Sequence, residues 1–434
     1  MLILKINIRL IAGLLFLLCT SKMIASTITS GNVSGDSIFS NIDSKIIRLI
    51  KDGNLPSMQI VVVTGENTTW SKFYDNDNHG KVLYKVGSIE KVLTATAYLQ
   101  LHEKRLINID DDVNKYLPFI LRHPRFPDIP ITIKMLLSHR SGLEMFQHQF
   151  DWDTKDIDLI KKDSAWLRRI KNWNKEEFIK ASLDTGGVNY NESVWKFKPG
   201  TNYIYSNSGF FILGYLLEKI TGQTYAEYIT ENIFKPLGMN DSRFVETDSS
   251  SSLFVAYTRN GKQNIKLPFM AGMYTTADDM AKFMIAHMNE GSYNGITLLR
   301  RESIELMYTK HTPGKNLFHL IDNCPYDGYG LGIIQYDEDI FGHGGSTIGY
   351  QSLWSFDRST KKGYLILTNI NGLVYGRKNF DSIWQTVSAI EEILKSELGF
   401  SRLRWITYYM IGSIIISFII FLMIRKRKRV FKTT

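Results

Sequence analysis

Ser88 and Lys91 lie three residues apart, where a short strand pattern (82–86) gives way to a helical one (88–106). Residues three apart on a helix share a face, with Cβ atoms about 5–6 Å apart, so the Lys91 amine can reach the Ser88 hydroxyl. A serine activated by a neighbouring base is a nucleophile for acyl transfer, and the positive end of a helix dipole favours an oxyanion beside it. Taken alone, this spacing is weak evidence for a catalytic pair, because a helix-capping serine followed by a solvated lysine has the same spacing.

Two further motifs downstream strengthen the case. Tyr205-Ser206-Asn207 stands at the head of an apolar helical pattern (207–221), and His343-Gly344-Gly345 precedes an alternating strand pattern. In this order the three elements resemble the penicillin-recognising serine hydrolases, which carry Ser-x-x-Lys, Tyr-x-Asn and either Lys-Thr-Gly or His-x-Gly. Four other stretches look like that family as well, at 136–143, 236–242, 271–283 and 329–333. The resemblance covers about residues 55–395 and is closest to the class C β-lactamases and related DD-peptidases and esterases.

The resemblance implies a role for each motif residue. Ser88 attacks the substrate carbonyl and becomes acylated. Lys91 and Tyr205 share the proton transfers that activate Ser88 and later water, and which of them is the general base stays open. Asn207 binds the substrate amide and positions Lys91.

The strand motif is implied to complete the site. His343 faces Tyr205, Gly345 and Ser346 bind the substrate, and the backbone N–H groups of Ser88 and Ser346 form an oxyanion hole. β-Lactamases usually carry Lys-Thr-Gly here, whereas an imidazole is only partly charged at neutral pH and Gly344 lacks a hydroxyl. We expect His343 to be neutral at pH 7. Because both differences weaken the binding of an antibiotic carboxylate, peptide or ester hydrolysis is favoured over efficient β-lactam hydrolysis.

The resemblance implies no cofactor and no metal. The segment DNDNHG (75–80) has the opening of a calcium loop, but Val86 stands where the closing Glu is required. The pattern therefore predicts a solvated turn.

Alternating apolar patterns predict strands at 58–64, 69–74, 329–336, 349–356 and 362–370. Helical spacing predicts helices at 88–106, 134–137, 175–183, 207–221, 225–233, 276–289 and 380–398, and the first of these has one apolar face. Strands near both chain ends around a helical middle predict an α+β fold of the β-lactamase/DD-peptidase type. We expect an antiparallel sheet flanked by helices, in a hydrolase domain at 55–398 with a mostly helical domain inserted at about 107–290.

The chain ends carry the signals for membrane topology. Residues 1–25 are typical of a secretory signal peptide, followed by a lead-in segment at 26–54. Residues 405–424 form an uncharged apolar run long enough to span a bilayer, and a basic tail follows at 425–434. These features predict a single-pass protein of the cell membrane with an extracytoplasmic catalytic domain and a cytoplasmic C-terminus. Because Cys19 lies in the signal, Cys324 is left alone and no intrachain disulfide is expected.

The formal net charge of +9 does not indicate nucleic-acid binding. The first 25 residues hold three cations and the last ten hold six, all without an acid, so the chain between them is formally neutral. The expected partners are the membrane and a small peptide or ester substrate, such as a cell-wall stem peptide. The oligomeric state is not determined by the sequence.

Three functions remain open on this sequence. The leading one is a DD-peptidase-like hydrolase acting on D-amino-acid-containing peptides. A carboxylesterase or weak β-lactamase on the same scaffold is the alternative. A non-catalytic penicillin-binding-like membrane receptor or scaffold is the third, which the intact set of Ser88, Lys91, Tyr205 and His343 disfavours.

Overall fold

The computed structural model describes residues 35–53, 55–75, 82–144, 173–244, 256–258, 261–263, 272–313, 327–347, 349–370 and 377–399. The chain divides into two compact units, residues 1–48 and 49–434, and the whole candidate site lies in the second. The predicted signal peptide, membrane span and basic tail lie outside the described residues. Within the described ranges, no helix combines the length and the apolar character needed to cross a bilayer.

The lead-in segment predicted at 26–54 contains a helix that was not anticipated. This helix, α2 (Gly35–Asp52), buries Ile42, Ile46 and Ile50. Residues four apart on a helix lie on the same face, so the spacing of these isoleucines was the available signal.

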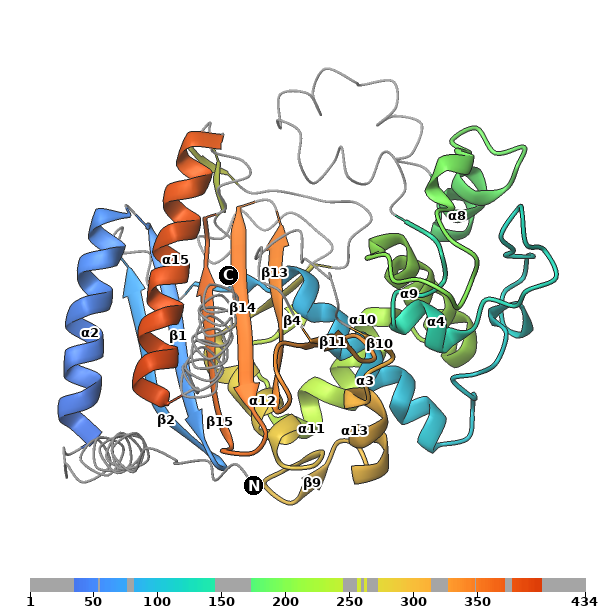
Figure 1. Cartoon of the computed structure of the whole chain (residues 1–434). Coiled ribbons are helices and arrows are strands. Elements are labelled where there is room, and N and C mark those ends of the chain that lie inside the picture. The colour runs from blue at the N-terminus through green and yellow to red at the C-terminus, as the bar shows by residue number, and fades with distance from the viewer. Residues whose placement is uncertain are drawn as a thin grey trace, which may run out of the picture. The chain divides into compact units, whose positions relative to one another are not determined.

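An eight-stranded antiparallel sheet forms the main framework, in the order β10-β11-β12-β13-β14-β15-β1-β2 (Figure 1). Its strands are β1 (Ser57–Thr64), β2 (Asn67–Asp75), β10 (Thr312–Pro313), β11 (Gly328–Tyr329), β12 (Ile334–Gln335), β13 (Ile340–Thr347), β14 (Tyr350–Asp357) and β15 (Lys362–Thr368). Strand β1 pairs with β15, with Val61 opposite Leu365, so segments about 300 residues apart in sequence become neighbours. This confirms the predicted α+β fold with its antiparallel sheet.

The prediction of one continuous strand at 329–336 is wrong. The chain forms two short strands there, β11 and β12, joined by a turn through Gly332. Gly332 has a φ of +69°, which L side chains rarely adopt, and a Cβ there would lie 2.5 Å from the Lys91 carbonyl oxygen. The turn therefore needs glycine on two grounds, and it packs directly against the helix that carries Lys91.

Helices cover both faces of this sheet (Figure 1). Along a strand, successive side chains point to opposite faces. Tyr364 of β15 contacts Glu391 of α15 (Arg377–Leu398) on one face, with 2.8 Å between the hydroxyl and carboxylate oxygens. Its neighbour Gly363 lies against Met284 of α12 (Ala277–Met288) on the other. Helix α12 falls inside the insertion predicted at 107–290, yet it packs on the main sheet.

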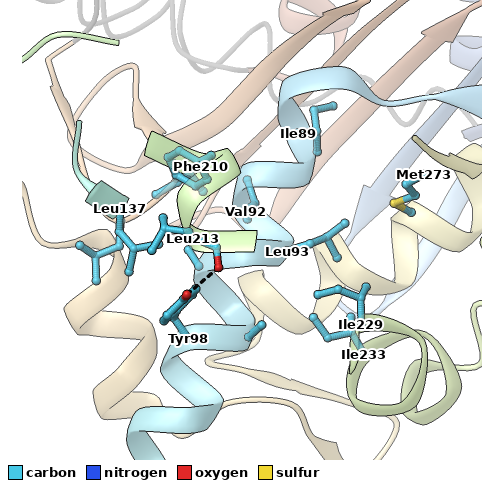
Figure 2. Packing of buried hydrophobic residues seen from close by; sticks show 14 of the residues in the cluster. Ile89, Val92, Leu93, Tyr98, Leu137, Phe210, Leu213, Ile229, Ile233 and Met273 are labelled. Atoms are coloured by element: carbon cyan, nitrogen blue, oxygen red, sulfur yellow. Dashed lines mark hydrogen bonds between the residues drawn. The ribbon is translucent and has the colours of Figure 1, made fainter. Parts of the chain in front are cut away.

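The helix that carries the serine motif lies in the middle of the core. It begins as a short 3₁₀ turn, η1 (Gly87–Ile89), and continues as α3 (Glu90–Glu103). Figure 2 shows residues of α3 packed among side chains of several other elements, and the Tyr98 hydroxyl donates to the Leu213 carbonyl at 2.6 Å. The predicted apolar face is buried, and the other sides of α3 are largely buried as well, between the sheet and the helical region.

The remaining helices are α4 (Ile133–Leu137), α8 (Lys175–Leu183), α9 (Asn207–Thr221), α10 (Tyr225–Ile229), α11 (Lys235–Leu237) and α13 (Arg301–Tyr308), with 3₁₀ turns η2 (Val113–Lys115) and η3 (Glu192–Val194) and a π-helical turn at Thr230–Phe234. Among them, α4, α8, α9 and α10 lie where the periodicity predicts them, whereas α11 and α13 were not predicted. A small sheet joins β3 (Tyr84–Lys85), β7 (Met273–Thr275) and β4 (Arg243–Phe244). Two hairpins complete the described elements: β5 (Ala256–Thr258) with β6 (Gly261–Gln263), and β8 (Ser292–Tyr293) with β9 (Ile296–Thr297).

Candidate active site

The Ser88 hydroxyl lies between two hydrogen-bonding groups. The Lys91 Nζ is 3.0 Å from the Ser88 Oγ, and the Tyr205 hydroxyl approaches the same oxygen at 2.8 Å. Lys91 also donates to the Asn207 Oδ1 at 2.8 Å, and its ammonium lies 4.8 Å from the centre of the Tyr205 ring. The structure thus brings together four of the predicted site residues: Ser88 and Lys91 from η1 and α3, and Tyr205 and Asn207 from the segment where α9 begins.

Ser88 is not a helix-capping residue. The N-cap of η1 is Val86 and that of α3 is Ile89, and neither helix start has a side-chain cap hydrogen bond. The alternative interpretation of the Ser-x-x-Lys spacing, a helix-capping serine beside a solvated lysine, therefore does not apply to Ser88. The Ser88 hydroxyl is half-buried and directed to Lys91 and Tyr205 instead.

The Tyr-x-Asn motif is held by the start of α9. The Ser206 hydroxyl caps that helix by accepting from the Gly209 N–H at 2.8 Å, which makes Asn207 the first helical residue. Helices α3 and α9 are in contact, so the side chains of Lys91 and Asn207 meet across that contact.

Strand β13 lies against the turn that carries the serine. A Cβ on Gly345 would fall 1.9 Å from the Val86 carbonyl oxygen, and one on Gly87 would fall 2.8 Å from the Ser346 nitrogen. Gly87 also has a φ of +53°, a value that favours glycine. These two glycines let the backbones of η1 and β13 meet, which places the Ser88 and Ser346 region where two N–H groups can face one oxyanion.

His343 is fully buried on β13. Its ring lies near Tyr205 as expected, with the ring centres 6.3 Å apart. Its Nε2 is 3.4 Å from the Tyr329 hydroxyl and its Nδ1 is 2.5 Å from the Gly344 carbonyl oxygen. The imidazole therefore belongs to an internal hydrogen-bond network, whereas Ser346, three residues later, is half-buried.

Two residues of that network were not predicted as site residues. His139 follows α4, and its Nε2 is 3.1 Å from the same Tyr329 hydroxyl that contacts His343. The available signal was their position in the family-like stretches 136–143 and 329–333.

Two lysines and one carboxyl group on the residues that flank Ser88 in sequence interact with one another. Lys85 and Lys91 are both buried, and both interact electrostatically with Glu90. Burial raises the pKa of Glu90 to about 7, against the opposing effects of the Met273 N–H, which donates to it at 2.8 Å, and of the two lysines. At neutral pH the Glu90 carboxyl group is therefore only partly ionised, and it offsets the charge of the two lysines only in part. No cluster of metal-ligating side chains is found among the described residues.

A family model described as Beta-lactamase matches residues 42–388. The chain belongs to the beta-lactamase family. The match spans all the motif residues and confirms the resemblance inferred from them. This beta-lactamase-family chain is accordingly a serine hydrolase.

Two curated relatives have similarity over most of the chain. The chain is 27% identical over 363 residues to PbpX of Bacillus subtilis (strain 168), which is named among the penicillin-binding proteins; the alignment covers 80% of the chain and 78% of PbpX. It is 24% identical over 347 residues to Protein flp of Staphylococcus aureus (strain N315), covering 76% of the chain and 63% of that protein. The chain therefore spans less than two thirds of the length of flp.

Solved structures share the fold. The D-amino acid amidase from Ochrobactrum anthropi SV3 matches with a TM-score of 0.62 at 20% identity, over 82% of this chain and 99% of that one. An octameric penicillin-binding protein homologue from Pyrococcus abyssi matches with a TM-score of 0.59 at 22% identity, over 82% and 77% of the two chains. A D-stereospecific amidohydrolase from Streptomyces sp. gives a TM-score of 0.57 at 23% identity, over 82% and 99%. These likenesses confirm the predicted β-lactamase/DD-peptidase-like fold.

Proposed function

We propose that this serine hydrolase cleaves the amide bond of D-amino-acid-containing peptides through an acyl-enzyme on Ser88, at the outer face of a cell membrane. The observation that carries the chemistry is the placement of the Ser88 Oγ within 3.0 Å of the Lys91 Nζ and 2.8 Å of the Tyr205 hydroxyl. A nucleophile within hydrogen-bond reach of a proton acceptor is the basis of acyl transfer in serine enzymes.

Acylation begins when the Ser88 oxygen attacks the carbonyl carbon and its proton passes to Lys91 or Tyr205. A fully protonated ammonium and a neutral phenol are both donors to Ser88, so neither can accept its proton. Reaction therefore proceeds from a state in which Lys91 is neutral or Tyr205 is ionised. The proton then moves to the leaving amine, and the same groups later activate the water that hydrolyses the ester.

Asn207 and strand β13 hold the substrate in this scheme. The Asn207 side-chain carbonyl oxygen accepts from the Lys91 ammonium at 2.8 Å, and in this scheme its amide nitrogen donates to the substrate. Gly345 and Ser346 lie on β13 next to η1, where a peptide can align along the strand. The N–H groups of Ser88 and Ser346 stabilise the oxyanion, and one such donor is typically worth about 10²–10³ in rate.

The choice of substrate rests on the strand motif. His343 is buried and Gly344 has no side chain, so the motif supplies neither an exposed cation nor a hydroxyl for a carboxylate. This favours peptides, amides or esters over β-lactam antibiotics. D-Residues are the first choice because two proteins of the same fold are named a D-amino acid amidase and a D-stereospecific amidohydrolase. A carboxylesterase is the second candidate, supported by the same lack of a carboxylate-binding group.

Turnover of matched substrates tests this proposal. The full chain in detergent is assayed with a peptide ending in D-Ala-D-Ala amide, which carries no C-terminal carboxylate, its L-Ala-L-Ala amide counterpart, a neutral p-nitrophenyl ester and a fluorescent penicillin. We expect kcat/KM for the D-peptide to exceed that for the L-peptide by about a hundredfold, since unfavourable contacts at the reacting centre reach that size. Equal rates for the two peptides contradict the D-specificity, and turnover of the ester alone identifies a carboxylesterase.

The proposed membrane anchor has its own test. Truncation after Leu398 removes residues 405–424, which hold the apolar run and no motif residue, so the product is expected to be soluble and fully active. Carbonate extraction of membranes, followed by immunoblotting and ester turnover, compares it with the full chain. Retention of the truncated protein in the washed membranes, or a folded but inactive soluble product, contradicts the assignment.

A further inference from the structure

Three buried rings are linked behind the Tyr-x-Asn and His-Gly-Gly motifs. His139, Tyr329 and His343 are each fully buried. The Tyr329 hydroxyl lies 3.1 Å from the His139 Nε2 and 3.4 Å from the His343 Nε2, so it joins the two imidazoles. They come from three separate parts of the chain: the end of α4, strand β11 and strand β13.

The two backbone groups at the ends of this network, the Ser206 N–H and the Gly344 carbonyl oxygen, indicate where each proton lies. The Ser206 N–H donates to the His139 Nδ1 at 3.0 Å, so that nitrogen is unprotonated and a neutral His139 carries its proton on Nε2. Nε2–H then donates to Tyr329, whose hydroxyl is left to donate to the His343 Nε2. The remaining His343 proton lies on Nδ1, which donates to the Gly344 carbonyl oxygen. These contacts fit a neutral His343 in the Nδ1–H tautomer.

The His139 end of the network also holds the segment that carries Tyr205. The His139 carbonyl oxygen accepts from the Ile204 N–H at 2.9 Å, its ring accepts from the Ser206 N–H, and the ring centre is 4.5 Å from that of Tyr205. His139 itself has a φ of +57°, an uncommon conformation for a residue other than glycine. The neighbouring Arg140 donates to the Gly200 carbonyl oxygen and fixes the approach to this segment. The residues on either side of Tyr205, Ile204 and Ser206, are thus both hydrogen-bonded to His139.

We propose that His139 and Tyr329 are positioning residues: His139 holds Tyr205 against Ser88, and the two together hold His343 uncharged beside Tyr205. The inference rests on the proposed role of Tyr205 in proton transfer. Protonation of the His343 Nε2 would turn the acceptor that faces the Tyr329 hydroxyl into a second donor, and two buried donors that face each other are unfavourable. Tyr329 and Tyr205 are titratable groups that lie directly against His343, and His139 and Lys91 lie behind them.

Two substitutions of His139 separate these two tasks. In His139→Asn, the amide oxygen can replace Nδ1 as acceptor from Ser206, but the donor to Tyr329 is lost. In His139→Gln, the longer amide can replace Nε2 as donor to Tyr329, but the Ser206 contact is lost. Tyr329→Phe removes the bond to His343 and retains the ring.

Acylation of the full chain by a neutral ester is measured from pH 5 to 9 for these variants. In Tyr329→Phe and His139→Asn, we expect the acid limb of kcat/KM to move about one unit to higher pH, so that activity falls about tenfold at pH 6 and is unchanged at pH 8.5. In His139→Gln, we expect the limb to stay in place while kcat falls about tenfold at every pH and KM is unchanged. Equal losses across all pH values in all three variants, matched by lower melting temperatures, would show a merely structural role and overturn the proposal.

A second measurement does not depend on activity. In the full chain with ¹⁵N-labelled histidine, the His343 signals are assigned by their loss in His343→Gln. We expect an unprotonated Nε2 and a protonated Nδ1 at pH 7 in the wild type, and protonation at higher pH in Tyr329→Phe. A His343 protonated on Nε2 overturns the inference. If the wild type shows the expected tautomer but no acylation by any ester or peptide, the proposed function fails while the assignment of the network stands.

Discussion

Replacement of Ser88 by alanine is expected to abolish acylation and turnover while the fold stays intact. The substitution removes the nucleophilic oxygen, and the rate that remains comes only from binding and oxyanion stabilisation, so kcat should fall by about a thousandfold or more. Ser88 caps no helix, so its truncation removes no helix-stabilising bond and the melting temperature should change little. Intact mass after incubation with a fluorophosphonate measures acylation, and ester or peptide turnover measures kcat.

A matched control for this variant is Ser193→Ala, which truncates an exposed serine of η3 far from the motif in sequence. It should be acylated as the wild type is. Activity of Ser88→Ala above about a tenth of that of the wild type would contradict the assignment of the nucleophile, because truncation of an acylated serine leaves far less.

Replacement of Tyr205 by phenylalanine is expected to lower kcat by about 10²–10⁴, the usual contribution of a positioned proton-transfer group. Only the hydroxyl that lies 2.8 Å from the Ser88 Oγ is removed. The ring remains, and with it the contacts to Lys91 and His139. KM should change little, because the hydroxyl acts on the serine proton rather than on the bound substrate. Steady-state kinetics with the substrate that is turned over best, and the melting temperature, give both quantities.

Tyr215→Phe is the matched control, since it removes a hydroxyl on α9 that contacts Glu176 and no motif residue. A loss of less than tenfold in Tyr205→Phe would assign the proton transfer to Lys91 alone. If both groups act as one unit, Lys91→Met and the double variant should lose about as much as either single variant, because groups that act together are strongly non-additive.

The sequence by itself determined the local relations. The three-residue spacing of Ser88 and Lys91 fixes their contact once a helix forms, and the structure has that contact at 3.0 Å. The alternating patterns located β1, β14 and β15, and the 3.6-residue periodicity located α8 and α9. These properties depend on neighbours within a few residues, which is why a linear pattern contains them. The order of the three motifs along the chain also indicated the family, because the motifs together supply residues of the whole active site rather than of one element.

Tertiary structure decided which distant groups meet. Ser88 and Tyr205 are 117 residues apart, and their contact depends on the packing of α3 against α9, which no local pattern specifies. The fold also adds to what was expected of His343 and of α3. His343 was expected beside Tyr205, but its link through Tyr329 to His139 joins strands and a helix end that only the folded sheet brings together. Likewise, α3 is buried on nearly all sides, because both the sheet and the helical region pack around it. The periodicity of its apolar residues predicts the helix but does not predict which elements surround it.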